Sequence, residues 1–73
     1  MDNIEPGYED WQQRLIDEYN ELSLKFIKLT RFIESPKFDN LGQGEQVDLR
    51  NQRAIMLQYL AVLGSRSTRF LKV

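Results

Sequence analysis

The chain contains no cysteine and no histidine among its 73 residues. Without cysteine it has no disulfide, no thiolate metal site and no cysteine nucleophile. Without histidine it lacks the commonest general base near neutral pH and the commonest metal ligand. No nucleophile–base pair is visible among the remaining residue types, so we expect a protein that is not an enzyme and that uses no cofactor or metal.

An excess of charge of one sign is also missing, because ten basic residues stand against eleven acidic ones and the formal net charge is -1. Non-specific binding to duplex nucleic acid depends on a dense basic face, so we expect no duplex partner. No apolar run approaches the roughly 20 residues of a membrane span, and the acidic N-terminus does not resemble a signal peptide. We therefore expect a cytoplasmic protein with no membrane partner.

A helical period of apolar residues runs from about residue 8 to residue 34. The centre of this stripe is formed by Leu15, Leu22 and Leu29. Their spacing of seven is typical of an amphipathic helix that packs along a neighbouring helix. Ser35-Pro36 ends the helix, because proline disfavours helical geometry in the residue before it. A serine followed by proline also favours a new short turn, expected over 36–41.

A second helix is expected over about 45–67, after the flexible segment 42–44, and a tail follows at 68–73. Its main stripe is predicted to be Leu49, Gln52, Met56, Tyr59 and Leu63. A second stripe, predicted to face elsewhere, consists of Arg53, Leu57, Leu60 and Gly64. The fold is therefore expected to be all-α, a single domain at 1–73 formed by an antiparallel two-helix hairpin with a short helical turn between.

Residues 54–63 carry one polar side chain, Gln58. A helix that packs on one neighbour needs a single apolar stripe, not apolar groups almost all the way round. A chain of this length also seldom has a sufficient core without a disulfide, a metal or oligomerisation. We therefore expect several hairpins to assemble into a homo-oligomeric helical bundle.

The residues also resemble a family of short helical proteins found in tailed-phage genomes and named after a crAss-like phage gene product. The resemblance covers about 11–66 and rests on Trp11-x-x-Arg14-Leu15-x-x-Glu18-Tyr19-x-x-Leu22-x-x-Lys25-Phe26-x-Lys28-Leu29-x-x-Phe32, then Phe38-x-x-Leu41, then Leu49-x-x-Gln52-x-x-x-Met56-x-x-Tyr59-x-x-x-Leu63-x-x-Arg66. It implies a phage origin and an accessory role, without established catalytic residues. The architecture is also similar to that of the phage anti-CBASS sponges, small helical hairpins that sequester cyclic-oligonucleotide immune signals between subunits.

A protein that holds a nucleotide needs flat aromatic faces for the bases and cations for the phosphates. The first helix supplies both kinds of side chain in Tyr8, Trp11, Arg14, Lys25 and Lys28. If two such helices pack antiparallel, the aromatic start of one approaches the basic end of the other. Two alternatives stay open: the aromatic residues close the end of the bundle, and the lysines pair on the helix surface with Glu21.

Arg50 and Arg53 lie near the start of the second helix, where the macrodipole favours anions over cations. This unfavourable placement indicates that an anionic ligand or a carboxylate from another subunit meets them. Gln52, on the expected seam, is more readily explained by a hydrogen bond that fixes the helix register.

Two functions are compatible with these features. The first is an oligomer that sequesters an anionic nucleotide immune signal, such as a cyclic oligonucleotide, in pockets between subunits. The second is a protein-interaction module that binds a host protein through its excess apolar surface and inhibits or redirects it.

Overall fold

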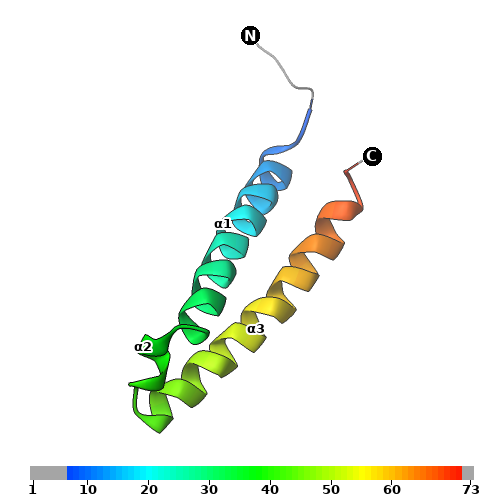
Figure 1. Cartoon of the computed structure of the whole chain (residues 1–73). Coiled ribbons are helices and arrows are strands. Elements are labelled where there is room, and N and C mark those ends of the chain that lie inside the picture. The colour runs from blue at the N-terminus through cyan, green and yellow to red at the C-terminus, as the bar shows by residue number, and fades with distance from the viewer. Residues whose placement is uncertain (1–6, 72–73) are drawn as a thin grey trace.

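The computed structural model describes residues 7–71, and all regular structure in this part of the chain is helical. Figure 1 shows two long helices, α1 (Asp10–Ile33) and α3 (Gln43–Thr68), which lie side by side and run in opposite directions. The short α2 (Pro36–Asp39) lies at the bend, so that α1 begins and α3 ends at the opposite, open end of the molecule. The prediction of an all-α chain is confirmed. Residues 72–73 of the expected tail lie outside the described residues.

Local hydrogen bonds explain where the helices begin and end. The start of α1 is a capping box in which the backbone N–H of Glu9 donates to Gln12 Oε1 over 2.8 Å. The helix therefore starts at Asp10 rather than at the expected residue 8. At the bend, Ser35 precedes Pro36 and its hydroxyl donates to the carbonyl oxygen of Phe32 over 2.7 Å. The serine and proline thus end α1 and begin α2, as the sequence indicated.

The α2 turn is fixed to the start of α3 by one glutamine. The Gln46 side-chain amide donates to the carbonyl oxygens of Phe38 and Leu41, over 3.0 and 3.1 Å. These carbonyls lie at the end of α2, where the last turn of a helix leaves acceptors without an intrahelical donor. The bend is therefore a defined turn that fixes α2 against α3.

The apolar core is small. Among the described residues, the buried apolar side chains are Leu15, Phe38 and Leu63. Leu63 is 0% exposed and Phe38 is 2% exposed, and the Phe38 ring also meets Phe32 edge-on at 6.3 Å between ring centres. One buried residue from each helix holds the three helices together.

The predicted seam of the second helix is wrong at Gln52, which is exposed, whereas Tyr59 is exposed but reaches α1 through its hydroxyl group. The predicted second stripe is wrong as well, since Arg53, Leu60 and Gly64 are half-buried while Leu57 is 52% exposed. Figure 1 shows α1 running along the length of α3, and Arg53 takes its place in this contact with a hydrogen bond to α1. Long side chains such as arginine bury their aliphatic part and keep the charged group at the edge of a contact. For this reason the side of α3 that faces α1 includes Arg53 instead of Gln52. The helix is thus rotated about its axis relative to the orientation that the apolar pattern indicated.

None of the helices in residues 7–71 has the combination of length and apolar character that crossing a bilayer requires.

Candidate functional site

The structure distributes the seven predicted binding residues over three parts of the molecule. Tyr8, Trp11 and Arg14 lie at the open end, and Arg50 and Arg53 lie towards the bend. Lys25 lines a separate hollow midway along the helices, and Lys28 is exposed on α1. The residues therefore do not form one site within a single chain.

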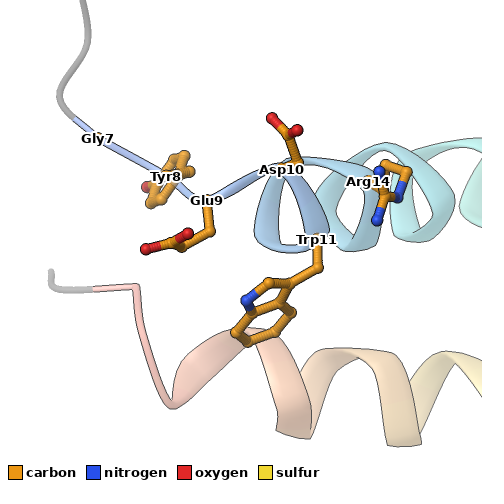
Figure 2. Close-up of a pocket in the computed structure, with 6 residues that line it drawn as sticks. All are labelled: Gly7, Tyr8, Glu9, Asp10, Trp11 and Arg14. Atoms are coloured by element: carbon orange, nitrogen blue, oxygen red, sulfur yellow. The ribbon is translucent and has the colours of Figure 1, made fainter.

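At the open end, the aromatic residues pack on the segment that follows α3. Tyr8 and Trp11 both meet Phe70 edge-on, with ring centres 5.7 and 5.6 Å apart. Figure 2 shows the Trp11 side chain pointing across to the end of α3. These contacts agree with the alternative in which the aromatics close the end of the bundle. Both residues stay partly accessible, since Tyr8 is 46% and Trp11 is 49% exposed.

The hollow beside these rings has a volume of about 500 Å³ and an unfavourable charge for an anion. Figure 2 shows its lining, which consists of Gly7, Tyr8, Glu9, Asp10, Trp11 and Arg14. Two carboxylates therefore accompany the one guanidinium group. The open end supplies aromatic surface for stacking, but it does not supply the positive charge that a phosphate needs.

Towards the bend, two arginines are held in place by aromatic rings. The Arg53 guanidinium carbon lies 4.8 Å from the centre of the Phe26 ring, and its Nε donates to Thr30 Oγ1 over 2.7 Å. The Arg50 guanidinium carbon lies 5.0 Å from the centre of the buried Phe38 ring. Such cation–π contacts orient an arginine side chain before any ligand arrives.

A hollow of about 420 Å³ opens beside the two arginines. It is lined by Thr30, Ile33, Glu34, Arg50 and Arg53. The lining carries two guanidinium groups and one carboxylate, so its charge is positive. Thr30 accepts from the Nε of Arg53, and within residues 7–71 neither terminal amino group of that guanidinium makes a hydrogen bond, so both can donate to a ligand. This arrangement suits the forked contact that arginine makes with phosphate or carboxylate.

Three residues that determine these sites were not predicted from the sequence. Phe26 and Thr30 position Arg53, and Phe70 anchors the aromatic residues of the open end. Phe26 and Thr30 are four residues apart and therefore lie on one face of α1. This spacing was the feature of the sequence that could have identified them. Their pairing with Arg53 depends on the rotation of α3, so neither residue stood out beforehand.

The hollow around Lys25 has a volume of about 250 Å³ and is lined also by Glu18, Glu21, Leu22 and Tyr59. Two carboxylates outnumber the single lysine there. The Tyr59 hydroxyl donates a hydrogen bond to the Glu18 carboxylate, which joins α3 to α1. The site is mixed in charge and therefore less suited to an anion than the hollow beside Arg50 and Arg53.

The Tyr59–Glu18 hydrogen bond predicts a pH dependence. The bond to the carboxylate raises the pKa of Tyr59 above its ordinary value of 10.0, because ionisation removes the donated proton. A pKa that is raised on folding contributes stability below the ordinary value, and this contribution is lost as the pH rises through the raised value. In an ultraviolet titration of phenolate formation, one of the three tyrosines should therefore ionise last.

Glu18→Gln supplies the matched control, since a neutral amide keeps the shape of the acceptor but not its charge. The last-titrating tyrosine should return towards the ordinary pKa in this variant and disappear in Tyr59→Phe. A wild-type titration identical to that of Glu18→Gln would show that the hydrogen bond does not persist in solution.

Comparisons with known proteins place this geometry in context. The Sequestin family model matches residues 9–69. An uncharacterised 7.5 kDa protein from the denB-rIIB intergenic region of Enterobacteria phage T4 is 37% identical over 60 residues, which are 82% of this chain and 94% of the phage protein. No solved structure matches the chain significantly.

Proposed function

Because the chain belongs to the Sequestin family, we propose that it captures a small anionic nucleotide signal of the host and holds it without chemical change. The family name denotes sequestration, a binding role in which no catalytic group is needed. The similarity to a T4 protein supports a phage origin and an accessory role. In this proposal the protein acts in the cytoplasm of the host cell, where it lowers the free concentration of a signal used in antiphage defence.

The observation that carries the proposal is the pair of oriented arginines towards the bend. Arg50 and Arg53 lie on aromatic rings beside a positively charged hollow of about 420 Å³. A hollow of this size is within the range of small-ligand sites. Two arginine forks fit the phosphates of a cyclic oligonucleotide or a related dinucleotide better than they fit a neutral ligand.

The bases of such a ligand need aromatic surface, which in one chain lies at the opposite end. Tyr8 and Trp11 provide it, since both residues are exposed. The molecule measures 51 Å along its longest axis, so a small ligand cannot reach from the arginines to these rings within one chain. We therefore propose that hairpins assemble into an oligomer in which the bend of one copy lies beside the open end of another.

A protein-interaction module is the second candidate, and the outer face of α3 favours it. Ile55 is 64% exposed and Val62 is 54% exposed, and they are seven residues apart on one side of the helix. Exposed apolar groups on one helix face are typical of surfaces that bind another protein. In this alternative the chain inhibits or redirects a host protein.

Native mass spectrometry distinguishes the two functions. The purified protein is measured alone and with a panel of cyclic dinucleotides, cyclic trinucleotides and cyclic ADP-ribose isomers. An oligomer that gains ligand mass in a fixed ratio to its subunits supports sequestration and identifies the ligand. A protein that gains no mass from any member of the panel, but retains a host protein in a pull-down, supports the interaction module instead.

A further inference from the structure

Although 29% of the residues in the chain are charged, two adjoining stripes on one face of the helix pair carry no charge, and within residues 7–71 charged side chains line this side only at the hollow towards the bend. On α1 the stripe on this face consists of Ile16, Tyr19, Ser23, Ile27 and Thr30. On α3 it consists of Ala54, Leu57, Ala61, Gly64 and Thr68. Ile16 and Tyr19 of the first stripe line a common hollow with Gly64 and Thr68 of the second, so the stripes adjoin. Depletion of charge from the centre of a surface is typical of protein interfaces.

The two halves of this uncharged face differ in shape. Towards the open end it has a hollow of about 320 Å³, lined by Ile16, Tyr19, Asn20, Gly64, Ser67, Thr68 and Leu71. Gly64 adds no side chain to this hollow, and a Cβ there would lie 3.4 Å from the Tyr19 ring, at van der Waals contact. Towards the bend the face instead presents Ile27 and Leu57, which are 43% and 52% exposed. Ile27 and Leu57, in the half towards the bend, are thus apolar side chains that suit the mostly apolar hollow in the half towards the open end.

We propose that a second copy of this chain packs on the uncharged face in the opposite direction, with the symmetry axis passing near Ser23 and Ala61. The antiparallel arrangement places Leu57 and Ile27 of each copy at the hollow of the other. The small side chains at the centre allow the helices to approach closely. An interface related by a two-fold axis uses the same surface on both copies, which this face satisfies.

A second copy is the occupant because the chain needs a permanent partner. Within residues 7–71, the buried apolar side chains are limited to Leu15, Phe38 and Leu63, a core below what usually stabilises a domain of this length. No disulfide compensates, because the chain has no cysteine. Another copy of the chain is the partner that is always present, and burial of Ile27 and Leu57 on both sides enlarges the core.

This inference rests on the proposed function and deepens it, because the pairing completes the nucleotide site. Arg53 and Phe70 lie on either side of Ala61 at about 12 and 14 Å along the helix, from a rise of ~1.5 Å per residue. A two-fold axis near Ala61 therefore brings Arg53 of one copy close to Phe70 of the second copy. Tyr8 and Trp11 pack on Phe70, so the pairing places the aromatic rings of the second copy at the same height along the helices as the arginines of the first.

Single cysteines test the arrangement without any nucleotide, because the chain has no cysteine of its own. Ala61→Cys should form a disulfide-linked dimer on mild oxidation, since the two copies of residue 61 meet at the axis. Leu57→Cys should not, because the two copies of residue 57 would be about 12 Å apart along the helices. Val62→Cys, next to Ala61 but on the outer face of α3, is the control for random collisions.

The mass of the particle provides the second test. Leu57→Glu should convert the dimer into a monomer in light scattering, because the charge would be buried in the interface. Ile55→Glu, on the outer face and 64% exposed, should leave the mass unchanged. Both positions are exposed in the single chain, so a fall in mass that is confined to Leu57→Glu reports the loss of the interface and not of a contact within the hairpin.

The outcomes separate the two proposals. A monomeric wild-type protein, or equal cross-linking of Ala61→Cys and Val62→Cys, overturns the pairing, whether or not nucleotides bind. Specific cross-linking at residue 61 together with no nucleotide binding supports the pairing and overturns the proposed function.

Discussion

Leu63→Ala is expected to remove a large share of the stability of the fold and to lower its unfolding midpoint strongly. The Leu63 side chain is 0% exposed and is the buried apolar residue that α3 contributes to the contact with α1. Truncating a buried leucine to alanine typically costs about 2–5 kcal/mol, from lost burial and from the cavity that remains. A domain of this length is stable by roughly 4–11 kcal/mol, so the loss is a large share of the total.

Urea titration followed by far-ultraviolet circular dichroism, at one fixed protein concentration, measures this loss. Val62→Ala is the matched control, because Val62 is the neighbouring residue but is 54% exposed on the outer face. Its midpoint should shift little, since exposed substitutions usually change stability by less than about 0.5 kcal/mol. Equal shifts in the two variants would mean that α3 does not pack on α1 through Leu63.

The helices and the bend could be predicted because their signals are local. The seven-residue spacing of Leu15, Leu22 and Leu29 indicated the long first helix, and α1 indeed spans Asp10–Ile33. Ser35-Pro36 indicated the stop, since both residues act on their own neighbourhood through a fixed backbone geometry and a hydroxyl bond. Signals of this kind do not depend on any other part of the chain.

The rotation of α3 could not be predicted, because its apolar residues are distributed nearly all round the helix. Stripes through Gln52 or through Arg53 differ little in apolar content, and the contact with α1 uses part of each, with Leu63 from the first and Arg53 from the second. The deciding contacts are long-range: Arg53 meets Phe26 and Thr30 of α1. For the same reason Arg53 was identified as a candidate ligand residue but its orienting partners were not.

Replacing both Arg50 and Arg53 by alanine is expected to weaken nucleotide capture by roughly 100-fold or more, taking about 1.5–3 kcal/mol for each charged hydrogen bond lost. Both guanidinium groups line the positively charged hollow towards the bend, where the ligand phosphates are proposed to bind. Isothermal titration calorimetry with the nucleotide identified by mass spectrometry measures the change. Arg31→Ala is the control, because it removes an exposed positive charge from the last turn of α1 and leaves the hollow intact.

Two conservative variants separate the charge of these arginines from their orientation. Arg53→Lys keeps the positive charge but loses the fork, whereas Thr30→Val keeps the whole arginine and removes the acceptor 2.7 Å from its Nε. If the forked contact carries the affinity, Arg53→Lys binds much more weakly than Thr30→Val, which loses only the pre-set orientation. If net charge alone carries it, Arg53→Lys binds as the wild type does and Arg31→Ala weakens capture as much as Arg53→Ala. That second pattern would mean that the ligand binds to the general field of the basic residues and not in the hollow beside Thr30.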